Sequence, residues 1–107
     1  MFRRTLIATA ASAFLVAGAS PALAEVSIHQ KGKKFSEKSI TIKAGTAVNF
    51  INDDKVAHNV YSRSAAGKFD TGAQQPGTTL SQVFDKPGKV KVRCAIHPRM
   101  KLTVNVQ

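Results

Sequence analysis

Beyond its first two dozen residues, the chain is predicted to fold as an all-β domain, a sandwich of two sheets. From residue 26 onward, short runs of alternating apolar and polar residues are separated by Gly, Pro, Asp and Asn. No stretch in this region repeats its apolar residues at helical spacing. The 83 residues that follow the N-terminal segment are enough for a single domain with one modest core.

The alternation places the strands in order along the chain. We expect strands at residues 26–29, 40–42, 48–50, 58–62, 80–84, 89–93 and 102–106. Ala44-Gly45 and Lys86-Pro87-Gly88 supply turns between them. Residues 63–78 show no regular pattern, and we expect a long loop or a short irregular strand there. The side chains expected in the core are those of Tyr61, Phe69, Phe84, Val90, Val92, Leu102, Val104 and Val106.

The N-terminal segment has the pattern of an export signal. Arg3 and Arg4 precede an apolar run at residues 6–19, and Ala22-Leu23-Ala24 offers the small residues that signal peptidase accepts. The run is shorter than the roughly 20 residues that span a membrane, although an uncleaved anchor is the alternative. We therefore expect residues 1–24 to be removed and residues 25–107 to form one periplasmic domain, without a membrane span and as a monomer.

The charge of the chain is strongly positive. It is +10 in full and +8 without residues 1–24, because Arg3 and Arg4 leave with that segment. Nucleic acid is not an expected partner outside the cytoplasm. The charge favours an acidic protein surface or anionic lipid, or it serves solubility alone.

A single cysteine follows the N-terminal segment. Small exported domains are often held by disulfides, but one cysteine excludes an internal disulfide. A metal ion bound by that thiol would add its binding free energy to the stability of the domain.

The segment from Cys94 through His97 to Met100 concentrates three soft or borderline metal ligands in one short loop. Thiolate and thioether favour copper(I), and imidazole suits both copper states, so the mixture accommodates a one-electron carrier. Cys94 ends one expected strand and Met100 precedes the next, which lets the loop direct its side chains to one point. His58, which begins a strand after a polar bend, is the expected fourth ligand.

Each of these four residues has an ordinary structural explanation when it is taken alone. A lone cysteine is usually a buried hydrophobe, a lone histidine at a strand start usually faces solvent, and a methionine usually fills a core. Their joint occurrence in one spacing, in an exported chain with an unpaired thiol, favours a metal site. Two equatorial histidines, a cysteine and a long axial methionine make the blue-copper arrangement.

Residues 48–59 and 87–100 together resemble the plastocyanin and amicyanin branch of the cupredoxins. The two-residue spacings of the ligand loop and Pro98 are similar to amicyanin. The resemblance implies a Greek-key β-sandwich of about eight strands and one type 1 copper ion, with His58, Cys94 and His97 equatorial and Met100 axial. It also implies that Asn59 ties the loop that precedes His58 to the cysteine loop. Three features depart from the family pattern: Arg99, the acidic bend Asp53-Asp54, and residues 63–78.

The function that follows is the transfer of single electrons between extracytoplasmic redox proteins. Copper storage, delivery or resistance is the alternative, since it would use the same ligands. We do not expect an enzyme, because a cysteine hydrolase needs a cleft, a copper oxidase needs a second metal site, and structural zinc usually draws on more cysteines.

The expected partner is a redox protein with an acidic docking surface. It would approach the exposed edge of His97 across an apolar patch of Ala95, Ile96 and Pro98, bordered by Arg99 and Lys101. A second basic cluster, Lys31, Lys33, Lys34 and Lys38, is expected to be a solvated face, with docking as the alternative. His29 is expected to be an ordinary surface residue.

Overall fold

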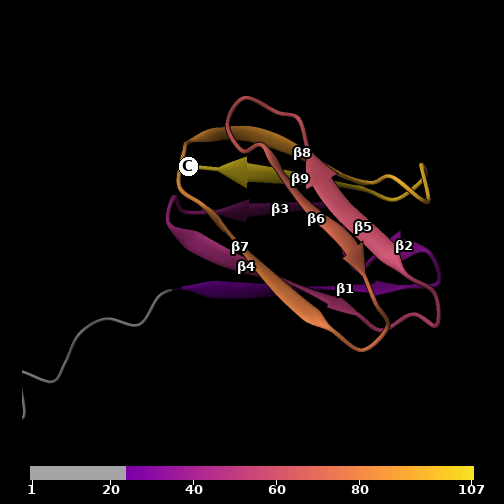
Figure 1. Cartoon of the computed structure of the whole chain (residues 1–107). Coiled ribbons are helices and arrows are strands. Elements are labelled where there is room, and N and C mark those ends of the chain that lie inside the picture. Colours follow the sequence, from indigo (N-terminus) through magenta and orange to yellow (C-terminus); the bar gives the residue numbers. More distant parts are fainter. Residues whose placement is uncertain (1–23) are drawn as a thin grey trace, which may run out of the picture.

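The computed structural model describes residues 24–107 and arranges them in two β-sheets that pack face to face (Figure 1). Within this described part, no helix is long and apolar enough to cross a membrane. The expected export segment, residues 1–24, lies outside the described residues except for Ala24.

The two sheets contain four and five strands. The first has the order β2 (Lys34–Phe35), β1 (Glu25–Lys31), β4 (Thr46–Asn52) and β7 (Thr79–Phe84). The second has the order β3 (Ser39–Ile42), β9 (Lys101–Val106), β8 (Gly88–Cys94), β5 (His58–Ser62) and β6 (Phe69–Gln74). The pairs β1/β4 and β3/β9 are parallel, and the other pairs are antiparallel. The expected all-β sandwich is confirmed, with nine strands in the described part of the chain.

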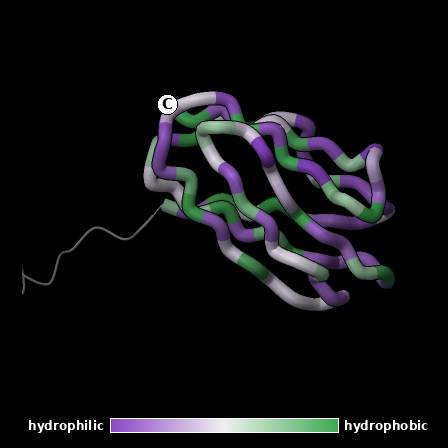
Figure 2. The backbone as a smooth tube through the Cα atoms, turned by 45° about the horizontal axis from the view of Figure 1, so that its top comes forward, coloured by the Kyte–Doolittle hydropathy of each residue, from purple (hydrophilic) through white to green (hydrophobic). Residues whose placement is uncertain are grey.

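Alternating side chains of the strands build the core between the sheets. Hydrophobic and hydrophilic residues alternate along much of the backbone (Figure 2), because successive side chains of a strand point to opposite faces. In β8 the buried residues Val90 and Val92 alternate with exposed Lys89 and Lys91. Leu102, Val104 and Val106 of β9 are buried in the same way, as predicted.

Four phenylalanines connect the two sheets through the core. The ring centroid of Phe50 in β4 lies 6.3 Å from that of Phe35 and 6.2 Å from that of Phe69. Phe69 also meets Phe84 edge to face at 5.7 Å. Phe69 belongs to the five-stranded sheet and the other three to the four-stranded sheet, so these contacts hold the layers together. The predicted core positions of Phe69 and Phe84 are confirmed.

The structure decides between the two alternatives for residues 63–78 and corrects the expectation for one side chain. β6 is the irregular strand within residues 63–78, and its pairing with β5 shifts register between Asn59 and Tyr61. A bulge of this kind interrupts the alternation of apolar and polar side chains by which a strand is predicted from the sequence. The prediction that Tyr61 lies in the core is wrong: it is half-buried on the opposite face of β5 from buried Val60, and the Arg63 guanidinium lies 5.4 Å from its ring centroid.

The unexpected strand β2 forms a hairpin with β1. Lys31 pairs with Lys34, which leaves only Gly32 and Lys33 in the turn. Both turn residues have positive φ, 63° and 59°. This is the geometry of the tight two-residue turns whose twist matches that of the strands.

The aromatic contacts generate a stability prediction. We expect Phe50→Ala to lower the free energy of unfolding by about 3–5 kcal/mol, because it empties a fully buried site between the sheets. Urea unfolding of the metal-free protein measures the change. Val83→Ala removes an apolar group that is 45% exposed and serves as the control, with an expected cost below about 1 kcal/mol. Equal costs for the two variants would contradict the proposed role of the aromatic contacts.

Candidate metal centre

The four predicted ligands lie at one end of the five-stranded sheet, on the right in Figure 1. His58 begins β5, Cys94 ends the neighbouring β8, and Met100 directly precedes β9. Val60 is paired with Cys94, so the side chains of His58 and Cys94 project from the same inner face of the sheet. His97 lies in the connecting loop, hereafter the ligand loop, which comprises residues 95–100.

Three donor atoms meet closely enough to share one ion. The Nδ1 atoms of His58 and His97 are 3.0 Å apart, and the Cys94 Sγ is 3.8 Å from each of them. A first-row ion in a trigonal plane, at about 2.0 Å from nitrogen and 2.3 Å from sulfur, needs its donors about 3.5–3.7 Å apart. Among residues 24–107, these three side chains form the group of His, Cys, Asp or Glu residues suited to a metal ion.

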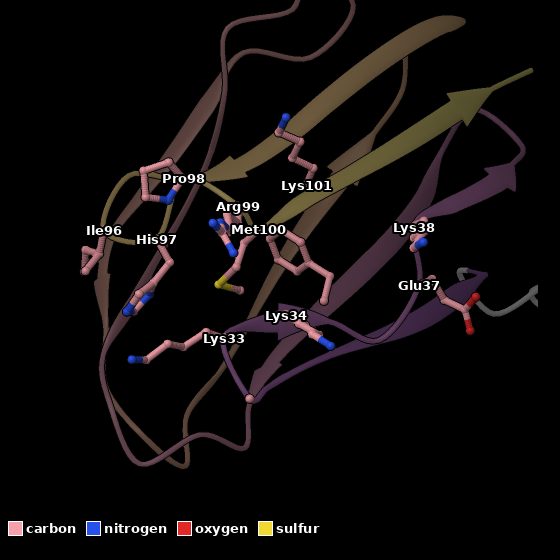
Figure 3. Close-up of a pocket in the computed structure, with 12 residues that line it drawn as sticks. Lys33, Lys34, Glu37, Lys38, Ile96, His97, Pro98, Arg99, Met100 and Lys101 are labelled. Carbon is pink, nitrogen blue, oxygen red and sulfur yellow. The ribbon is translucent and has the colours of Figure 1, made fainter.

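Met100 adds a thioether beside this group. Its side chain is buried, and its backbone N–H donates to the His97 carbonyl at 2.9 Å, which closes the ligand loop. The close-up shows the Met100 sulfur and the His97 ring extending from the same loop (Figure 3). Two imidazoles, a thiolate and a thioether are donors that fit copper.

The loop leaves one imidazole partly accessible and encloses the other. His58 and Cys94 are buried, whereas His97 is half-buried between exposed neighbours, among them Ile96 at 51% exposure. Burial, and then the nearby His58, lower the pKa of His97. A lowered pKa keeps this imidazole neutral at neutral pH, with a lone pair available for a metal.

Asn59 joins the two chain segments that carry the ligands, as the resemblance implied. Its backbone N–H points to the Cys94 Sγ at 3.4 Å, and its side-chain oxygen accepts from the Ala95 N–H at 3.4 Å. Its amide nitrogen donates to Asp70 in β6 at 2.7 Å, so the bulged strand also holds the site.

Asp54 contacts a candidate ligand, although the sequence analysis did not identify it as part of the site. Its Oδ2 lies 2.8 Å from the Nε2 of buried His58. The same carboxylate accepts the backbone N–H groups of Gly32 at 3.0 Å and Lys33 at 2.9 Å. The Lys33 N–H, followed by the His58 and Gly32 hydrogen bonds, lowers the pKa of Asp54 to about 2. Asp54 is therefore ionised at neutral pH.

The neighbouring Asp53 has a different partner. Its carboxylate meets Nδ1 of exposed His29 at 2.5 Å, on the surface of β1. The expectation that His29 is a surface residue is confirmed. Asp54 precedes His58 by four residues, and its contacts with the Asn52 side chain and the β1–β2 turn, which the sequence does not reveal, distinguish it from Asp53.

The Asn52 side chain holds the bend that contains Asp53 and Asp54 by three hydrogen bonds. Its side-chain oxygen accepts the Asp54 N–H at 2.9 Å, and its amide nitrogen donates to the Val56 carbonyl at 3.0 Å and the Gln74 carbonyl at 2.9 Å. Gln74 is itself buried and accepts from Gln30 of β1 at 2.8 Å. The bend is thus anchored in a buried polar network that connects both sheets.

Comparisons with known proteins agree with this geometry. Residues 22–107 match the family model of copper binding proteins, plastocyanin/azurin family. The chain is 33% identical to amicyanin-alpha of Methylorubrum extorquens over 115 residues, covering 99% of this chain and 96% of that protein. It is 34% identical to the methylamine utilization protein MauL of the same organism over 83 residues, covering 77% of this chain and 71% of that protein.

Solved structures show the same architecture. The crystal structure of amicyanin from Paracoccus versutus matches with a TM-score of 0.70 and 26% identity, over 85% of this chain and 88% of that one. A copper-containing nitrite reductase from Thermus scotoductus also gives 0.70, with 29% identity over 77% of this chain; the match spans only 22% of the enzyme. The chain therefore belongs to the plastocyanin/azurin family of copper-binding proteins, the cupredoxins that its ligand motifs resemble.

Proposed function

We propose that His58, Cys94, His97 and Met100 bind one copper ion and that the protein uses it to carry single electrons between exported redox partners. The observation that carries the proposal is the approach of three donor atoms to within 3.0–3.8 Å of one another. When bound, copper supplies a one-electron couple, and the mixed nitrogen and sulfur donors suit both of its oxidation states.

The protein's part is to hold the donors still during electron transfer. His58 and Cys94 belong to paired strands, and Asn59 hydrogen-bonds to the sulfur and to the ligand loop. Donors that are fixed in this way resist the geometric change that a change of oxidation state would otherwise cause. Transfer then requires little rearrangement of the chain.

Asp54 selects the useful tautomer of His58. An ionised carboxylate can accept a hydrogen bond but cannot donate one, so the hydrogen bond of 2.8 Å places a proton on Nε2 of His58. The Nδ1 lone pair is then directed toward Cys94 and His97, where it can bind the metal. Asp54 acts through His58 and is a positioning residue.

His97 provides the route to a partner. It is the half-buried ligand, and exposed Ala95, Ile96 and Pro98 surround it as an apolar patch. Arg99 and Lys101 add positive charge at the border of this patch. A monomeric, exported protein would meet an acidic redox protein here.

Copper storage or delivery would use the same donors but would need them to exchange readily. Here His58 and Cys94 are buried, and they are hydrogen-bonded to Asp54 and to the Asn59 backbone, which favours retention of the ion. The geometry supports the electron carrier more strongly.

The hydrogen bond of Asp54 generates a prediction about His58. We expect Asp54→Asn to weaken copper binding by about 10–100-fold, because the charged acceptor for the Nε2 proton is lost. In the copper-free protein, ring-nitrogen NMR should show that His58 no longer keeps a single Nε2–H tautomer. Asp53→Asn is the matched control and should change neither property, since Asp53 contacts His29. Unchanged affinity and tautomer in Asp54→Asn would refute the positioning role.

Cys94→Ser tests the thiolate. The copper-loaded wild type should be intensely blue, because a short bond from copper to a thiolate gives strong charge-transfer absorption in visible light. The serine variant should lose this band in the absorption spectrum. A wild type that binds copper and stays colourless would show that the metal lies elsewhere.

Met100→Gln tests the axial position. We expect the variant to retain copper and its potential to fall, because an amide oxygen favours copper(II) and the axial ligand tunes the potential. Voltammetry of both proteins measures the shift. An unchanged potential would mean that Met100 is not the axial ligand.

A further inference from the structure

A groove of about 700 Å³ opens beside the ligand loop. One wall is the β1–β2 turn with β2 and the residues that follow it, and the other is the ligand loop with the start of β9 (Figure 3). His97 and Met100 line the groove, so it reaches the candidate metal centre. The two walls are about 60 residues apart in sequence, and only the fold brings them together.

The charge of the groove is strongly positive. Its lining contains five cationic side chains and one carboxylate, Glu37; the cations are Lys33, Lys34, Lys38, Arg99 and Lys101. Among residues 24–107, none of the five lies in an ion pair with a carboxylate. All five residues are exposed, so their charges are available to a partner.

The concave shape of the groove strengthens its positive electrostatic potential. Charges on facing walls add in the space between them, and low-dielectric walls focus the potential of a cleft. The apolar floor includes buried Phe35 and Met100. A matching occupant carries several carboxylates on a narrow segment that can enter the cleft.

We infer that this groove is the docking site for an acidic segment of the redox partner. The inference rests on the proposed function and extends it, because three lysines of the second basic cluster line the same groove as Arg99 and Lys101. A seated segment would place the partner against His97 and Met100. A protein segment fits the concave shape better than a flat anionic membrane does.

Three charge-reversal variants of equal net charge test the inference in the copper-loaded protein. Lys34→Glu/Lys38→Glu changes the wall away from the ligand loop, and Arg99→Glu/Lys101→Glu changes the other wall. Lys89→Glu/Lys91→Glu changes exposed residues of β8 outside the groove and is the matched control. A hexaglutamate peptide serves as the probe, and an unchanged blue absorption band checks that each variant folds and holds copper.

At low ionic strength, we expect each groove variant to bind the peptide about tenfold or more weakly than the control variant does. The difference should shrink at high salt, where the Debye length falls to a few ångströms. If Lys34→Glu/Lys38→Glu binds as the control does, the groove is not the docking site, and either the ligand loop alone or net charge accounts for binding. If the Lys34→Glu/Lys38→Glu variant loses binding to anionic phosphatidylserine vesicles but still binds the peptide, the groove faces a membrane and the inference is wrong.

The proposed function is tested separately in the same samples. Reversible one-electron voltammetry of the wild type needs no partner and does not depend on the groove. A protein that binds the peptide in the groove but shows no reversible couple would contradict electron transfer and leave the docking surface supported. If the wild type shows a reversible couple and the groove variants bind the peptide as the control variant does, electron transfer is supported and the docking surface is refuted.

Discussion

The hydrogen bond between His58 and Asp54 is the contact on which the arrangement of the candidate site depends. His58 is fully buried, so each of its ring nitrogens needs a polar partner within the protein or a bound ion. Asp54 takes one nitrogen, which leaves the other to face Cys94 and His97. The carboxylate is itself satisfied by the Gly32 and Lys33 N–H groups, so the tight β1–β2 turn sets the direction of the imidazole.

The sequence predicts the ligand set because three of its members share one short loop. The loop that carries Cys94, His97 and Met100 joins two neighbouring antiparallel strands that show a clear period of two, and the pairing of Arg93 with Lys101 closes it. His58 required more, since its position depends on the pairing of β5 with β8. The sequence indicates His58 by its place at the start of a strand after a polar bend, and the resemblance to the cupredoxins implies the same residue.

The features that the sequence did not predict depend on non-local or very short structure. β2 has only two residues, too few to show a period, and the alternation of β6 is interrupted at Gly72 and Ala73. Tyr61 lies on the outer face that the regular alternation of β5 gives it. The contacts of Asp54 depend on the Asn52 side chain, which accepts the Asp54 N–H, and on the hairpin turn at Gly32 and Lys33. The order of residue types along the chain does not reveal these contacts, because they join residues that only the fold brings together.

The β1–β2 turn contributes both to the contacts of Asp54 and to the lining of the basic groove. The backbone of Lys33 faces inward and holds Asp54, while its side chain extends into the basic groove toward His97 (Figure 3). A two-residue turn between paired strands has little freedom to move. If a partner docks in the groove as proposed, its contact with the Lys33 side chain would fall on this rigid turn, and the hydrogen bonds of Asp54 to the turn would keep the His58 imidazole in place.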